Sequence, residues 1–140
     1  LQLLKSTLAD WGVDARGKIH GAERLIEGGC QRIWVDEPGR LMLYANQSGG
    51  FRVRCPDCAA NVAAAFGRAH LAWKRGSPRS MSCTSCGRMA PLEDWQMDPK
   101  GVFSRWALVF SGAVGTRLTE AAEAELKGVL GDYQLVVRRP

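Results

Sequence analysis

The sequence lacks several features that would assign it to a large class of proteins. It contains two histidines, and no apolar run approaches the roughly 18 to 20 residues needed to cross a bilayer. Its opening, LQLLKSTLADWGVD, lacks the basic start and the long apolar stretch of a secretory signal. We therefore expect a cytoplasmic protein that does not span a membrane.

Motifs of the common enzyme classes are also missing. No Gly-rich phosphate loop or nucleophile elbow occurs in the sequence. A zinc deaminase would require His-x-Glu and Pro-Cys-x-x-Cys, but two residues separate His20 from Glu23, and Pro56 lies inside a cysteine pair. Glu93 and Asp94 are predicted to lie in a solvated turn or helix start. The sequence therefore predicts a protein that is not an enzyme and has no small-molecule substrate.

What the chain does contain is typical of a globular protein, since 46% of its 140 residues are hydrophobic and 24% are charged. This length predicts a single domain over 1–140. The net charge of +5 is uneven, because residues 51–100 hold eight basic and four acidic residues while 1–50 hold six of each. The stretch 68–88 contains no acidic residue, and its basic residues are Arg68, Lys74, Arg75, Arg79 and Arg88.

Four of the cysteines form two matched pairs. Cys55 and Cys58 lie in FRVRCPDCAAN, Cys83 and Cys86 lie in MSCTSCGRM, and 24 residues separate the pairs. A Cys-x-x-Cys turn can present two sulfurs to neighbouring corners of a tetrahedron, so two such turns complete the shell of a zinc ion. A shell of four thiolates leaves no position for a reactive water. The sequence therefore predicts a structural Zn²⁺ ion held by these four residues.

Alternative interpretations of these residues are weaker. Two disulfides are disfavoured in a cytoplasmic setting, and a thioredoxin-like centre would not require the second pair. The first turn has Ala59 where the second has Gly87, which adopts strained backbone conformations more easily. We expect Cys30 to be a small buried or half-exposed residue, and His70 to lie on the apolar face of a helix rather than to bind the metal.

Local patterns predict an α+β fold. Helices are expected at 1–10, 20–29, about 60–75 and 116–131, the last with Thr119 as its N-cap. Strands are expected at 31–37, 40–46, 51–55, about 102–110 and 133–139. The turn at Pro38 and Gly39 joins the first two strands, and QSGG at 47–50 ends the second. The predicted architecture is a four-cysteine zinc ribbon at 51–92 with an inserted helix, packed on a small antiparallel sheet with flanking helices.

The order of these features resembles a group of small, uncharacterised bacterial zinc-ribbon proteins. The resemblance covers about residues 50–138, through CPDC, an aromatic-bearing helix, CTSCGRMAPLEDW, an aromatic-rich strand and LKGVLGDYQLVV. It implies Cys55, Cys58, Cys83 and Cys86 as metal ligands and supplies no catalytic residue. Some members are labelled as sugar-transporter ATPases, but this chain lacks a phosphate-binding loop. In size and build the chain is also similar to immunity proteins of bacterial toxin systems.

Two functions fit these features better than a third, an enzyme with an unrecognised site. The first is a protein-interaction module, such as an immunity or adaptor protein, because tryptophans often anchor interfaces and the chain has five. Trp73 and Trp95 are the tryptophans expected to reach a partner, while Trp106 is expected to be buried. The alternative is nucleic-acid binding through the basic residues of 68–88, since phosphates attract such a surface.

Overall fold

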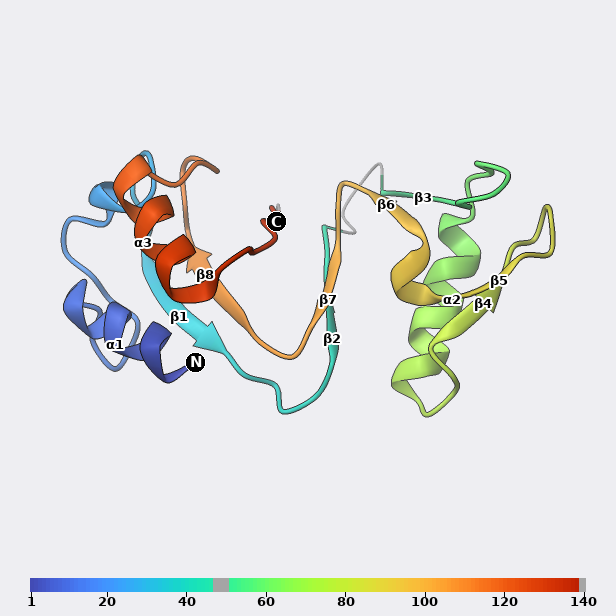
Figure 1. Ribbon diagram of the computed structural model, residues 1–140, viewed down its shortest axis with the longest axis horizontal. Helices are drawn as coiled ribbons and strands as arrows, with labels where there is room; N and C mark the ends of the chain where they lie inside the picture. Colours follow the sequence, from blue (N-terminus) through green and yellow to red (C-terminus); the bar gives the residue numbers. More distant parts are fainter. Residues whose placement is uncertain (47–50, 139–140) are drawn as a thin grey trace. The chain divides into compact units, whose positions relative to one another are not determined.

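The computed structural model describes residues 1–46 and 51–138 (Figure 1). The chain divides into two compact units, unit 1 with Leu1–Met42 and Ser104–Leu135, and unit 2 with Leu43–Phe103 and Val136–Pro140. The chain crosses from one unit to the other within each of two paired strands, β2 (Met42–Tyr44) and β7 (Val102–Ser104), and again between Leu135 and Val136. The single domain expected from chain length stays a prediction.

Unit 1 combines helices with a two-stranded ribbon. Its elements are α1 (Gln2–Asp10), the 3-10 turn η1 (Ala22–Arg24), β1 (Arg32–Asp36), β8 (Ala107–Ser111) and α3 (Glu120–Leu130). Strands β1 and β8 are antiparallel, with Ile33 opposite Phe110 and Val35 opposite Leu108. Because side chains alternate along a strand, these four apolar residues share one face of the ribbon.

The core of unit 1 lies on that apolar face. The buried members of this core are Leu4, Leu8, Trp11, Leu25, Ile33, Ala122 and Leu126. Residues from α1 and α3 therefore cover the ribbon on one side, and Trp11 Nε1 donates a hydrogen bond to Glu125 Oε2 at 2.8 Å. The predicted N-cap is confirmed, because the Thr119 hydroxyl accepts a hydrogen bond from the amide of Ala122.

Unit 2 is built from short hairpins around one helix. Its elements are β3 (Arg52–Arg54), α2 (Ala63–Lys74), β4 (Ser80–Ser82), β5 (Met89–Pro91), the 3-10 turn η2 (Leu92–Asp94) and β6 (Gln96–Asp98). Strand β3 pairs antiparallel with β6, and β4 pairs antiparallel with β5. Figure 1 shows α2 beside the β4–β5 hairpin.

Two of the predicted metal ligands belong to the core of unit 2. Its buried residues are Val53, Cys55, Val62, Phe66, Met81, Cys83, Ala90, Leu92 and Trp95. The helix predicted at about 60–75 is confirmed as α2, and its apolar stripe faces this core through Val62 and Phe66. The cysteines of the cluster and the packing of this small core are therefore linked.

The α+β class with a four-cysteine ribbon and an inserted helix is confirmed, but the strand pairing differs from the prediction. The expected connection of β1 to β2 through Pro38 and Gly39 is not a hairpin, because β1 pairs with β8 and β2 pairs with β7. The distant strand β8 offers Leu108 and Phe110 to the apolar face of β1, which a local turn signal cannot reveal.

Two other predicted elements are shorter than expected. The helix predicted at 20–29 is reduced to the single turn η1, because Gly21, Gly28 and Gly29 adopt positive φ angles of 69°, 83° and 76° on either side of it. The strand predicted at 102–110 is divided into β7 and β8.

The break between β7 and β8 has a local cause. The Ser104 hydroxyl donates to the carbonyl oxygen of Trp106 at 2.7 Å and accepts from its amide at 3.4 Å. This side chain competes with the ladder for backbone hydrogen bonds. Trp106 is half-buried and not the most buried tryptophan, contrary to the prediction, whereas Trp11 and Trp95 are buried.

Two further predictions concern the segments 133–139 and 47–50. Residues 133–138 form no strand, because the β propensity of this tail is not met by a partner strand among the described residues. The rest of that predicted strand, and the QSGG segment at 47–50, lie outside the described residues.

No helix in residues 1–46 or 51–138 is long and apolar enough to cross a membrane.

Candidate metal centre

The first cysteine pair lies in a tight turn at the end of β3. The amide of Cys55 donates to the carbonyl oxygen of Ala60 at 3.0 Å, and the amide of Ala59 donates back to the carbonyl oxygen of Cys55 at 3.0 Å. The amide of Asp57 points at Cys55 Sγ, at 3.4 Å. The chain then returns along β3 through a bridge between Arg54 and Asn61. The pair therefore occupies the tip of a short hairpin.

The second pair repeats this arrangement at the tip of the β4–β5 hairpin. The amide of Cys83 donates to the carbonyl oxygen of Arg88 at 2.7 Å, and the amide of Gly87 donates to the carbonyl oxygen of Cys83 at 3.0 Å. The amides of Ser85 and Cys86 point at Cys83 Sγ, at 3.4 and 3.5 Å. The two turns therefore share three equivalent hydrogen bonds, and the second turn adds the contact from the amide of Cys86.

One position distinguishes the two turns. Gly87 has a φ of 78°, and the equivalent Ala59 has a φ of 61°. Ala59 is the one non-glycine residue with positive φ among the residues that the structure describes. An L residue is disfavoured in this left-handed conformation, so the first turn holds local strain that the second avoids.

The two hairpin tips bring the four sulfurs together. Cys55 Sγ lies 3.6 Å from Cys86 Sγ, Cys58 Sγ lies 3.7 Å from Cys83 Sγ, and all four sulfur atoms lie within 4.8 Å of one another. Sulfurs placed about 2.3 Å from a zinc ion at the corners of a tetrahedron are separated by about 3.8 Å. The four cysteines are free thiols in this structure. Their separations and chemistry fit a tetrahedral metal site.

The pKa values of two of the cluster's thiols are shifted in opposite directions. Hydrogen bonds from the amides of Cys86 and Ser85 lower the pKa of the Cys83 thiol to about 6. The amide of Arg88 acts to lower the pKa of the Cys86 thiol, but desolvation and the three neighbouring sulfurs outweigh it and raise this pKa to about 12. Four adjacent thiolates repel one another, so all four lose their protons readily only when a cation lies between them.

Each hairpin contributes one buried and one exposed sulfur ligand. Cys55 and Cys83 are 1% and 4% exposed, whereas Cys58 and Cys86 are exposed. The buried pair belongs to the core of unit 2, so a metal ion at this site would be attached directly to that core. The other pair lies at the surface.

An ion pair missed by the sequence analysis joins the two turns. Arg88 Nη1 donates to both carboxylate oxygens of Asp57, at 2.9 and 3.0 Å. Asp57 lies between the first two cysteines and Arg88 follows the second turn, so the contact spans the cluster. No local sequence signal pairs these two residues, because they are 31 positions apart in the sequence. The pairing raises the pKa of Arg88.

A second ion pair neutralises Arg79. Its Nε and Nη2 donate to the Glu93 carboxylate at 2.9 and 3.2 Å, which raises the pKa of Arg79 and lowers that of Glu93. The Arg79 guanidinium also lies over the ring of Trp73, 5.7 Å from its centroid. Two of the five basic residues predicted to form a binding surface are therefore paired with carboxylates from outside 68–88.

The remaining residues of the predicted binding surface differ in their exposure. Arg68, Lys74 and Arg75 are exposed and form no ion pair with any described residue. Trp73 is half-buried. The prediction that Trp95 reaches a partner is wrong, because this side chain is 2% exposed and its Nε1 donates to the carbonyl oxygen of Ala90 at 3.2 Å.

Neither His70 nor Cys30 takes part in the cluster. His70 lies between the rings of Phe66 and Trp73, as expected of a histidine on an apolar helix face, and desolvation followed by the charge of Lys74 lowers its pKa. Cys30 is half-exposed, in agreement with the prediction, and desolvation raises its pKa.

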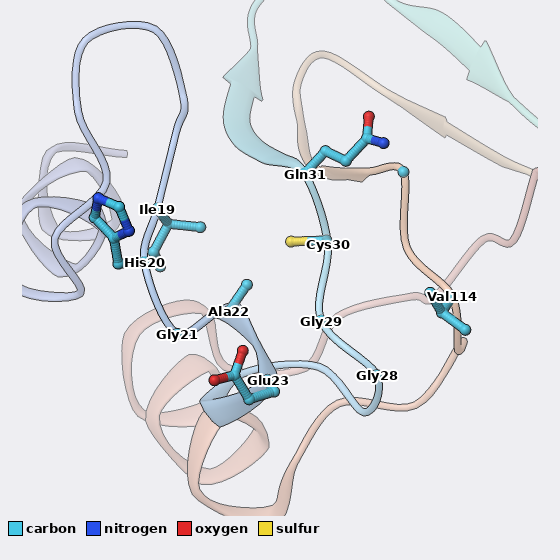
Figure 2. Close-up of a pocket in the computed structure, with 11 residues that line it drawn as sticks. Ile19, His20, Gly21, Ala22, Glu23, Gly28, Gly29, Cys30, Gln31 and Val114 are labelled. Carbon is cyan, nitrogen blue, oxygen red and sulfur yellow. The ribbon is translucent and has the colours of Figure 1, made fainter.

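Cys30 lines a shallow hollow of about 420 Å³ in unit 1 (Figure 2). The hollow is bordered by glycine bends and by the side chains of Ile19, Glu23 and Gln31. Every buried side-chain nitrogen or oxygen among the described residues has a hydrogen-bond partner, so no orphaned polar group points into it. The hollow therefore lacks the features of a built ligand site.

Comparisons with family models, with curated proteins and with solved structures find no match to this chain.

Proposed function

We propose that the chain binds one structural zinc ion through Cys55, Cys58, Cys83 and Cys86. The observation that carries this proposal is the convergence of four sulfurs within 4.8 Å at the tips of two equivalent hairpins. Thiolate ligands in a tetrahedral set favour zinc over magnesium or calcium, which prefer oxygen. When bound, the ion supplies charge neutralisation and a cross-link between the hairpins.

A metal of this kind has a structural rather than a catalytic role. Four protein ligands leave no coordination position for water or substrate, so the site does not act as a Lewis acid. Cys55 and Cys83 instead tie the ion to the core of unit 2, and metal binding then contributes to the folding free energy. Reduced thiolates fit a cytoplasmic location.

The zinc-stabilised unit serves in this proposal as a rigid module that binds another macromolecule. A protein partner, as for an immunity or adaptor protein, is supported by two apolar side chains exposed on unit 2, Leu71 at 48% and Met89 at 66%. The support from tryptophans is weaker than the sequence indicated, because Trp95 is buried and Trp73 is in contact with Arg79.

Nucleic-acid binding is the second candidate, and the distribution of charge favours it. Unit 2 contains ten basic and four acidic residues, for a net charge of +6, whereas unit 1 contains nine basic and ten acidic residues, for a net charge of −1. The whole positive excess of the chain therefore lies on the unit that carries the cysteine cluster. Such a surface attracts polyanions.

Metal analysis of the purified chain tests the zinc proposal. We expect about one zinc per chain in the parent protein. Cys83→Ser removes a buried ligand and is expected to lower both the zinc content and the solubility. Cys30→Ser is the matched control, because Cys30 lies outside the cluster, and should retain zinc. A metal-free Cys83→Ser variant that melts like the parent would contradict a structural role.

A further inference from the structure

A row of exposed residues lies along the outward face of α2 and its C-cap residue. Residues 64, 68, 71 and 75 recur at helical spacing and are all exposed, while Val62 and Phe66 on the opposite face are buried. The row therefore presents Arg68, Leu71 and Arg75 to solvent, with Lys74 exposed beside it. We refer to Arg68, Leu71, Lys74 and Arg75 as the α2 basic row.

The three cations of this row are available to an external anion. None of them forms an ion pair with a residue in the described part of the chain. By contrast, Arg79 and Arg88 are occupied by Glu93 and Asp57. Of the five basic residues in 68–88, the three that form no ion pair with a described residue therefore all belong to the α2 basic row.

We propose that the α2 basic row binds double-stranded DNA by contacting its phosphates. This inference rests on the proposed function, because the zinc-linked core of unit 2 holds α2 in place. Arg68 lies in α2 and Arg75 is its C-cap residue, seven positions further along, so at the helical rise the two are about 10.5 Å apart along the axis. The major groove of B-DNA is about 12 Å wide and admits an α-helix, so basic side chains at this spacing can reach the phosphates that border it.

Duplex DNA fits this face better than the other nucleic acids. Unpaired bases are bound mainly by stacking on aromatic rings, and no aromatic side chain is fully exposed among the described residues of unit 2. The half-buried ring of Trp73 is in contact with Arg79 and Phe103. The deep, narrow major groove of double-stranded RNA does not admit side chains.

The experiment measures binding of the zinc-loaded full chain to a fluorescent 20-base-pair DNA duplex of mixed sequence, at several salt concentrations. The test variant replaces Arg68, Lys74 and Arg75 by Gln. The control variant replaces Arg40, Arg105 and Arg117 by Gln, since these arginines of unit 1 are exposed and removing them gives the same net charge. Zinc content and circular dichroism are measured on the same samples.

We expect the affinity of the test variant for the duplex to fall at least about tenfold at 50 mM salt. The slope of the logarithm of its association constant against the logarithm of the salt concentration should become shallower by about 2.7, which is about 0.9 for each of three lost phosphate contacts. The control should lose less than about twofold. Equal losses in both variants, no binding by the parent at low salt, or tighter binding of single-stranded DNA or duplex RNA would overturn the proposal. Parent protein that holds zinc without binding DNA would contradict this inference alone, whereas protein without zinc would contradict the proposed function.

Discussion

The two units of this chain differ in what stabilises them and in the charge they carry. Unit 1 covers one apolar ribbon face with residues of two helices, and the structure describes no metal-ligating cluster in it. Unit 2 has β-strands of three residues within Leu43–Phe103, and its core includes two cysteines of the cluster. Unit 2 also carries the net positive charge. The four-cysteine cluster and the net positive charge therefore belong to the same unit.

Removal of the metal should produce the largest difference between the units. With zinc chelated under reducing conditions, we expect amide protection to be lost in α2 and the β4–β5 hairpin, while α1, β1, β8 and α3 keep theirs. The reason is that binding energy for structural zinc, about 10–16 kcal/mol in small peptides, is also folding energy. Hydrogen exchange followed by mass spectrometry resolves the two units. Simultaneous loss of protection in both would show that they fold as one.

Core truncations should also separate the units. Ile33→Ala in unit 1 is expected to cost about 2–5 kcal/mol, and Phe66→Ala in unit 2 about 3–5 kcal/mol, because both side chains are fully buried. Only Phe66→Ala should weaken zinc binding, since Phe66 shares a core with Cys55 and Cys83. Chelator competition measures this difference. Equal effects of both variants on zinc affinity would argue against a metal site coupled to unit 2 alone.

The two cysteine turns provide a comparison within unit 2. Ala59→Gly should raise stability and Gly87→Ala should lower it, each by about 1 kcal/mol, because both residues have positive φ. A methyl group at Gly87 would meet no atom within 4 Å other than those of its own residue and its two chain neighbours, so the expected effect comes from backbone conformation alone. Thermal unfolding of the zinc-loaded variants measures both. Changes of the same sign would contradict the equivalence of the turns.

The smallest effect is expected from the ion pair across the turns. Asp57→Asn removes the carboxylate that accepts from Arg88, but both side chains are substantially exposed, so the melting temperature should change little. Zinc content should not change. Loss of zinc from this variant would mean that the ion pair, rather than the sulfurs alone, holds the two hairpins together.

The four-cysteine cluster was predictable from sequence because its information is local. Each Cys-x-x-Cys turn is contained within a few residues, and the spacing of Val62, Phe66 and their neighbours specifies α2 within one segment. The pairing of β1 with β8 was not predictable in this way. It joins Ile33 to Phe110 across most of the chain, whereas the turn signal at Pro38 and Gly39 suggested a nearer partner.

The ion pairing and burial of the residues proposed to bind a partner were less predictable, because both depend on folding. Counting residues 68–88 alone omits Asp57 and Glu93, which the fold brings to Arg88 and Arg79. Trp95 likewise follows two acidic residues in the sequence, but after the turn η2 its side chain lies in the core, where its Nε1 donates to the carbonyl oxygen of Ala90. Neither outcome has a signal in local sequence.

X-ray absorption at the zinc edge of the purified protein tests the central claim most directly. The account predicts four sulfur neighbours at about 2.3 Å and no oxygen or nitrogen in the first shell. A shell with a light-atom neighbour, or a protein without bound metal, would contradict a closed structural site formed by Cys55, Cys58, Cys83 and Cys86.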